Sequence, residues 1–157
     1  MRSTPEHVPE HLRATIGLRV DLIDTPALVV DLDAMERNIQ RMAEFAHKHQ
    51  VRWRPHAKMH KSAEIALQLE KAGARGHCVQ KVSEAEALAA GGVADLYISN
   101  EVLAGAKLLR AARLAAQLAA RGGRLGIAVD SEDGITRLSE AMRVALGDDV
   151  HVSAQKA

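Results

Sequence analysis

Short apolar segments alternate with amphipathic helical patterns along most of this chain. The segments begin roughly 20 to 30 residues apart, the length of a strand, a crossover helix and two short loops. Such connections join parallel strands, so the rhythm predicts an α/β fold with a parallel sheet. The five predicted strands are Ala27–Leu32, Val51–Lys58, Gly76–Lys81, Ala94–Ser99 and Leu125–Asp130, and residues 149–154 would add a sixth.

The number of units limits the architecture. With 157 residues, of which 47% are hydrophobic, the chain is long enough for one well-cored domain. Residues 1–20 have no apolar period and predict an N-terminal arm, which leaves residues 21–157 for the domain. A closed (β/α)8 TIM barrel takes about 250 residues. Five to six βα units therefore fit either a partial barrel or an open doubly wound sheet, and periodicity alone leaves both open.

Composition excludes several classes of partner. Lys and Arg number 21 against 20 acidic residues, a formal net charge of +1, so there is no general basic field for nucleic acid or an anionic membrane. No apolar run has the length of a signal-peptide core or a bilayer span. Cys78 is the only cysteine, which excludes disulfides within the chain and makes a cytoplasmic protein the expectation.

Four helices are predicted from N-cap residues that precede apolar stripes. Two of them begin with the spacing of a capping box, in which the N-cap and the third helical residue satisfy each other's backbone N–H groups. These pairs are Asp33 with Glu36 and Ser83 with Glu86. Asn100 and Ser131 are the expected N-caps of the other two helices. The predicted ranges are 33–49, 83–90 before Gly91-Gly92, 101–121 before Gly122-Gly123, and 131–146.

The octapeptide Arg54–Lys61 places Lys58 at the end of a predicted strand. Because a strand alternates its faces, Arg54, His56 and Lys58 point the same way. Repulsion among these cations and partial burial favour a neutral amine on Lys58, which attacks an aldehyde to form a Schiff base and so suits pyridoxal phosphate. From the spacing alone, a solvated loop lysine is the more frequent outcome, as it is for most lysines.

Polar residues also end the three following strands. Gln80, Asn100 and Asp130 are expected at the same edge of the sheet as Lys58, because right-handed crossovers bring the ends of parallel strands together. Gln80 would hydrogen-bond a cofactor or substrate there, or would be a rim amide without a role. Asn100 and Asp130 are equally suited to capping the helices that follow them.

His56 and His60 have the i, i+4 spacing of two metal ligands on a helix. Pro55 and the strand context argue against a helix here, so a metal site at this pair is disfavoured. His56 is better interpreted as a lining residue of a cofactor pocket beside Lys58, and a structural histidine that bonds a neighbouring strand is an equal alternative.

Several of these motifs, taken together and in order, resemble the N-terminal half of the D-threonine aldolases and 3-hydroxy-D-aspartate aldolases. The resemblance extends from about Leu22 to about Ala145. It is based on the segments Asp24–Asp33 with Asn38-Ile39, Arg54–Lys61, Val79–Glu86, Gly91-Gly92 and Ser99–Val102. Several motifs at consistent separations are far more specific than one lysine octapeptide.

The resemblance implies a pyridoxal-phosphate enzyme with an alanine-racemase-like (β/α)8 barrel, followed by a mainly β domain. Lys58 matches the Schiff-base lysine, with His56 and Gln80 as cofactor-binding candidates. The implied reaction is lyase cleavage of small β-hydroxy-D-amino acids, such as D-threonine or 3-hydroxy-D-aspartate, to an aldehyde and glycine or its analogue. The implied assembly is a homodimer.

The sequence departs from the family after Val144. The family's divalent-metal ligands and glycine-rich phosphate loops have no counterpart here, so no metal ligand is assigned, and a truncated form that is inactive alone is expected. Three alternatives stay open: a noncatalytic or vestigial pyridoxal-phosphate-binding fragment, a D-serine dehydratase or racemase relative, and an unrelated small α/β binding domain.

Overall fold

The computed structural model describes residues 10–147, and the chain divides into two units, residues 1–38 and 39–157. The described part of the first unit holds the short helix α1 (Glu10–Arg13), the 3-10 helix η1 (Val20–Leu22) and the start of α2 (Leu32–Lys48). The prediction of a strand at Ala27–Leu32 is wrong. Residues 27–31 are exposed and have no regular structure, because apolar composition alone does not make a strand when no neighbouring backbone pairs with it.

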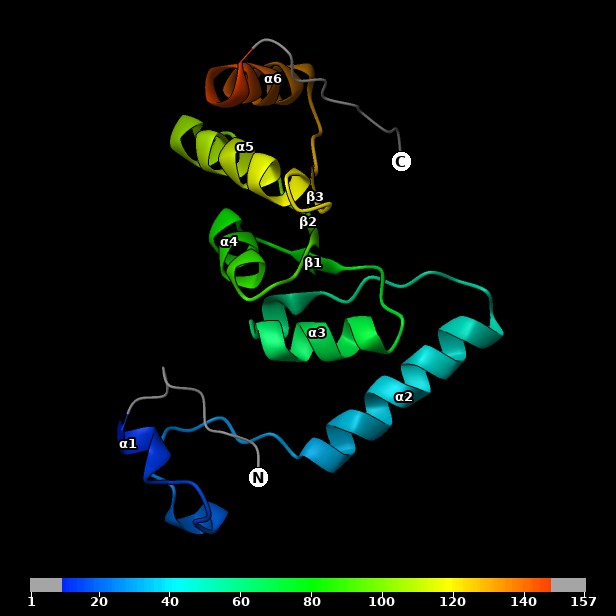
Figure 1. Ribbon diagram of the computed structural model, residues 1–157, viewed down its shortest axis with the longest axis vertical. Helices are drawn as coiled ribbons and strands as arrows, with labels where there is room; N and C mark the ends of the chain where they lie inside the picture. The colour runs from blue at the N-terminus through cyan, green and yellow to red at the C-terminus, as the bar shows by residue number, and fades with distance from the viewer. Residues whose placement is uncertain (1–9, 148–157) are drawn as a thin grey trace. The chain divides into compact units, whose positions relative to one another are not determined.

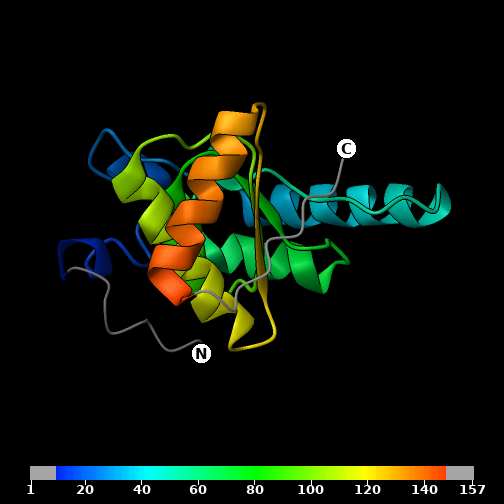
Figure 2. The ribbon, with the colours of Figure 1, turned by 90° about the horizontal axis from the view of Figure 1, so that it is seen from above.

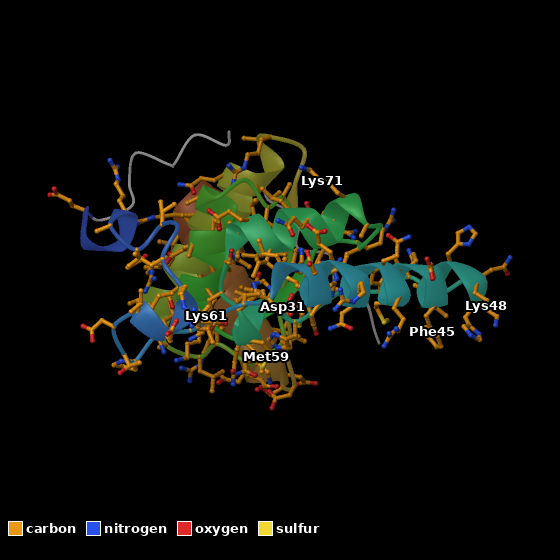
Figure 3. All side chains as sticks on the ribbon, turned by 90° about the horizontal axis from the view of Figure 1, so that it is seen from below. Asp31, Phe45, Lys48, Met59, Lys61 and Lys71 are labelled. Carbon is orange, nitrogen blue, oxygen red and sulfur yellow. The ribbon has the colours of Figure 1, made fainter. Side chains whose placement is uncertain are left out.

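Helix α2 confirms the predicted helix 33–49 to within one residue at each end. Its N-cap is Asp31 rather than Asp33, since the Asp31 carboxylate accepts a hydrogen bond from the Ala34 N–H at 2.9 Å. Figure 3 shows Asp31 at one end of this helix and Lys48 at the other. Near its C-terminal end the Phe45 ring lies against His49, with ring centroids 4.4 Å apart.

The second unit contains a parallel sheet of three strands in the order β1 (His77–Val79), β2 (Asp95–Ile98) and β3 (Arg124–Ile127). The connecting helices are α4 (Val82–Ala90) and α5 (Gly105–Ala119), and α6 (Glu132–Leu146) follows β3. These three helices lie on one side of the strands (Figures 1 and 2). The predicted βα rhythm is therefore confirmed for these three strands, while residues 149–154 lie outside the described part of the chain.

The core lies between the sheet and its helices. Alternate strand residues Val79, Leu96 and Ile98 are at most 1% exposed and pack with Leu88 of α4 and Leu118 of α5. Each fully buried aliphatic side chain of this size contributes about 1.5–3 kcal/mol relative to exposure. The intervening positions Cys78, Tyr97 and Gly126 are in register with one another and belong to the opposite face.

The predicted strand Val51–Lys58 forms only an isolated parallel bridge, from His56 to Cys78. Its backbone still follows β1, because the Trp53 and Pro55 carbonyls accept hydrogen bonds from Arg75 and Cys78 at 2.9 and 2.8 Å. Pro55 has no N–H to offer a ladder. The chain then turns into the 3-10 helix η2 (Ala57–Met59), so Lys58 lies in a turn instead of at a strand end.

Two of the other predicted helix starts need correction. Helix α4 begins one residue early, and Glu84, not Glu86, accepts the hydrogen bonds of the preceding backbone. Helix α5 begins at Gly105, so Asn100 is not its cap. The prediction for α6 is confirmed, because the Ser131 hydroxyl accepts a hydrogen bond from Gly134 N–H at 3.2 Å.

The remaining helix is α3 (Ala63–Lys71), which precedes β1 and is capped by the Ser62 hydroxyl. Across residues 10–147 no helix combines the length and apolar character needed to cross a bilayer.

Candidate functional site

Four polar residues follow the carboxyl ends of parallel segments in the second unit. Gln80 directly follows β1, Asn100 lies just beyond β2 and Asp130 beyond β3. Lys58 follows the bridge at His56, where the chain runs parallel to β1. Because the strands are parallel, these residues lie at one edge of the sheet, as the sequence predicted.

Both ring nitrogens of His56 have hydrogen-bond partners. Its Nδ1 accepts from the backbone N–H of Lys58 at 3.3 Å, and its Nε2 lies 3.3 Å from the Ser99 hydroxyl. Burial lowers the pKa of His56 below its usual 6.5, and the charge of Lys58 lowers it further against the opposing effect of Glu84. The ring is therefore neutral at pH 7, and it bonds a neighbouring strand end.

Lys58 has a different environment from the one expected. Its side chain is exposed on η2, so the expected partial burial is wrong. Arg54 does not add to its cationic company either. The Arg54 guanidinium is bonded to the Asp95 carboxylate at 2.8 Å, at the opposite, amino-terminal end of β2.

Glu84 organises the turn between β1 and α4. Its carboxylate accepts hydrogen bonds from the N–H groups of Gln80 at 2.9 Å and Lys81 at 3.3 Å, and lies 3.6 Å from the Lys61 amine. Burial raises the pKa of Glu84, but these hydrogen bonds and the nearby cations Lys61 and Lys81 outweigh it and leave the pKa below the usual value. The Gln80 side chain itself is exposed. Met59 and Lys61 belong to the neighbouring turn (Figure 3).

A hollow of about 380 Å³ lies where α4 and α5 begin. Gln80 and Asn100 line it, together with the cationic side chains of Lys81, Lys107 and Arg110. Lys58 and Asp130 are not among its lining residues. The four predicted residues therefore lie at one edge of the sheet, but only Gln80 and Asn100 line the hollow.

The alternative of a metal site at His56 and His60 has no support in the geometry. The two residues are separated by η2 and do not share a helix face, and His60 uses Nδ1 to accept the Ser62 N–H at 3.1 Å. Burial lowers the pKa of His60. Within the described part of the chain, no cluster of three or more His, Cys, Asp or Glu side chains is suited to a metal ion.

Sequence reasoning missed two residues of this edge, Ser99 and Glu84. Ser99 ends the apolar run of β2 and has the same strand parity as Tyr97, on the face opposite the buried Leu96 and Ile98. The sequence signal that could have indicated Ser99 is a polar residue at the end of an apolar run, on the strand face opposite the buried residues.

Comparison with known proteins shows the family to which this chain belongs. Residues 30–154 match the family model of the alanine racemase N-terminal domain, which is most of the chain. The chain belongs to this family. An alanine racemase N-terminal domain has a TIM-barrel-like fold, and the parallel strands with helices on one side are the arrangement found in a segment of such a barrel.

The relatives of this alanine racemase N-terminal domain include lyases of D-amino acids. The chain is similar to the crystal structure of D-threonine aldolase from Filomicrobium marinum, with a TM-score of 0.73 and 49% sequence identity. The match covers 78% of this chain and 32% of that one. It is 45% identical to the 3-hydroxy-D-aspartate aldolase of Paracoccus denitrificans over 80% of this chain and 32% of the relative. It is 41% identical to the D-threo-3-hydroxyaspartate dehydratase of Delftia sp. over 69% of this chain and 27% of the relative. The chain thus spans about a third of the length of these proteins, and corresponds to their N-terminal portion.

Proposed function

We propose that this chain is the cofactor-binding part of a pyridoxal-phosphate-dependent lyase that cleaves β-hydroxy-D-amino acids. The observation that carries the proposal is the exposed amino group of Lys58 at the carboxyl edge of the sheet. Enzymes with this type of barrel place their functional groups at that edge. The identity of 45–49% with proteins named 3-hydroxy-D-aspartate aldolase and D-threonine aldolase supplies the substrate class.

The residues of the edge fit pyridoxal phosphate in part. The cofactor has an aldehyde, which needs an accessible amine, and the Lys58 side chain is exposed and has no ion-pair partner among the described residues. Gln80, exposed at the same edge, would donate a hydrogen bond to the cofactor or to the substrate. When bound, pyridoxal phosphate supplies an electron sink for a bond broken at the substrate Cα.

The chain's own residues would position these groups. The neutral His56 holds the turn that presents Lys58, and Glu84 holds the backbone of Gln80 through its N–H group. Breaking the Cα–Cβ bond of a β-hydroxy-D-amino acid, with loss of the hydroxyl proton, releases an aldehyde, and addition of a proton to Cα leaves glycine. The family also implies a divalent metal.

The experiment compares this chain with a fusion in which the C-terminal two thirds of the Paracoccus relative is joined to it. Both proteins are supplied with pyridoxal phosphate and Mn²⁺ and assayed for aldehyde release from D-threonine and 3-hydroxy-D-aspartate. We expect aldehyde from the fusion and none from the fusion with Lys58→Ala. Aldehyde release that survives this substitution would refute the role of Lys58.

A dehydratase is the second candidate, and the 41% identity with D-threo-3-hydroxyaspartate dehydratase favours it specifically. Dehydration breaks the Cα–H and Cβ–O bonds instead of the Cα–Cβ bond and releases water, and hydrolysis of the resulting imine gives ammonia and a keto acid. Measuring ammonia beside aldehyde in the same reactions decides between the two lyases.

A further inference from the structure

A directional chain of three hydrogen bonds begins at the backbone N–H of Lys58 and ends at the carbonyl of Val79. The backbone N–H of Lys58 can only donate, so His56 Nδ1 accepts through its lone pair. A neutral ring then has its proton on Nε2, which donates to the Ser99 hydroxyl. The Ser99 hydroxyl in turn donates to the Val79 carbonyl at 3.2 Å, which can only accept. Each donor in the chain has one acceptor, and the pattern admits a single tautomer of the ring.

The chain of hydrogen bonds ties three neighbouring segments together. His56 belongs to the bridged segment beside β1, Val79 is the last residue of β1, and Ser99 directly follows β2. Ser99 is held twice by the same carbonyl, because its backbone N–H also donates to Val79 at 2.9 Å. The imidazole therefore joins the turn of Lys58 to a fixed point of the sheet.

We propose that His56, in its neutral Nε2–H form, is a positioning residue that fixes the backbone of Lys58 at the sheet edge, and that protonation of His56 releases the Lys58 N–H. The inference rests on the proposed function, which makes Lys58 the cofactor-binding lysine. It assigns to His56 a task other than contact with the cofactor.

Protonation has this effect because an imidazolium has a proton on both nitrogens and cannot accept from Lys58. The titratable neighbours of the ring are Lys58 on its own turn, Cys78 across the bridge, and Glu84 of α4, which is paired with Lys61. Burial and the charge of Lys58 lower the pKa of His56, so the bond is intact at pH 7 and is lost as the pH falls through that lowered value.

Two substitutions separate the two bonds. In His56→Asn the amide oxygen takes the place of Nδ1, so the bond from Lys58 N–H is kept and the bond to Ser99 is lost. In His56→Gln the amide nitrogen takes the place of Nε2, so the bond to Ser99 is kept and the bond from Lys58 is lost. Neither amide titrates, so neither variant retains the pH dependence.

The test measures hydrogen-exchange protection of the Lys58 amide by NMR in the full chain without cofactor, between about pH 5 and 8. We expect wild-type protection to fall about fivefold as His56 is protonated, the effect of losing one typical hydrogen bond. His56→Asn should keep the protection at every pH, and His56→Gln should lack it at every pH. Protection that is independent of pH in the wild type, or a pH step that persists in His56→Gln, would overturn the proposal.

A second readout keeps this inference distinct from the proposed function. The wild type and the two variants, each fused to the C-terminal part of the Paracoccus relative, are treated with pyridoxal phosphate and borohydride, and the ratio of label on Lys58 to label on Lys61 is measured by peptide mass spectrometry. We expect this ratio to fall over the same pH range in the wild type alone. If Lys58 takes no label at any pH while its amide shows the step, the proposed function fails and the structural role of His56 stands. A labelling ratio that stays constant while the amide shows the step overturns the link from His56 to Lys58 reactivity.

Discussion

The carboxylate of Asp95 joins three neighbouring segments at the amino-terminal edge of the sheet. It is bonded to Arg54 at 2.8 Å and to Arg124, the first residue of β3, at 2.7 Å. Burial raises the pKa of Asp95, but the hydrogen bonds from the two guanidinium groups outweigh it and the pKa lies below its usual value. The carboxylate therefore stays charged and paired at pH 7.

Asp95→Asn removes this charge and leaves two arginines without their partner. We expect the free energy of unfolding to fall by about 2 kcal/mol, the range for hydrogen bonds to charged groups. Urea unfolding followed by circular dichroism measures it. Glu140→Gln, an exposed change on α6, is the control and should alter the value by less than about 0.5 kcal/mol. Equal effects of the two substitutions would show that the arginine pairs add nothing.

At the scale of single residues, periodicity predicted which residues lie at the carboxyl edge but not what they bond. Lys58 and Gln80 follow directly from the ends of apolar runs. The bond from His56 to Ser99 depends on the register of separate segments, here His56 opposite Cys78 and Cys78 opposite Tyr97. A pattern within one segment does not specify the register against another. Glu84 was missed because Glu84 and Glu86 are both close enough to the start of α4 to be its capping partner, and Glu86 was the one predicted.

At the scale of elements, the contact between α3 and α4 depends on a glycine. A Cβ built on Gly91 would lie 2.2 Å from the Cβ of Ala63, so Gly91→Ala forces the two helices apart. We expect a loss of about 1–3 kcal/mol, as for other overpacked contacts. Gly105→Ala, in the first turn of α5, has no atom within 4 Å of the new Cβ and is the matched control.

The control substitution should be neutral or stabilising by up to about 1 kcal/mol, because alanine favours a helix over glycine. Thermal unfolding of the two variants and the wild type decides the matter. A Gly91→Ala protein as stable as Gly105→Ala would mean that α3 and α4 are not packed as described.

The elements themselves were predicted unevenly, for a physical reason. The helices α2 and α6 signal their own ends through apolar stripes and capping side chains, and their bounds were close to those expected. Strands need partners as well as composition. Of five apolar runs, three pair in a ladder, Val51–Lys58 pairs only at His56, and Ala27–Leu32 does not pair with any described residue.

At the scale of the whole molecule, three partly or fully buried histidines make stability depend on pH. Burial lowers the pKa of His56, His60 and His77 below the usual 6.5. The unfolded chain therefore binds more protons below that value, so the stability they provide is complete above about pH 6.5 and is lost as the pH falls toward the lowered pKa values. Glu70, whose pKa burial raises, acts in the opposite sense nearer its usual 4.5.

We expect the urea midpoint to fall as the pH is lowered from about 7 to 5.5. His77→Gln should weaken this dependence, since its amide nitrogen can still donate to the Ala66 carbonyl, which His77 Nε2 meets at 2.9 Å, but does not titrate. Gln117→Asn, an exposed change on α5 at a side chain that does not titrate, is the control and should leave the slope unchanged. A midpoint that rises on acidification in the wild type would contradict the assignment.

The central claim, that Lys58 is the lysine which binds pyridoxal phosphate, is tested most directly by mapping the covalent adduct. The chain, alone and fused to the C-terminal part of the Paracoccus relative, is incubated with pyridoxal phosphate, reduced with borohydride and digested for peptide mass spectrometry. Lys61→Arg serves as the matched control for Lys58→Arg, since both lysines lie on the same exposed turn. We predict that Lys58 is the principal labelled residue in the fusion, that Lys58→Arg abolishes this label and that Lys61→Arg does not. Label on Lys61 or Lys81 with Lys58 unmodified would contradict the account.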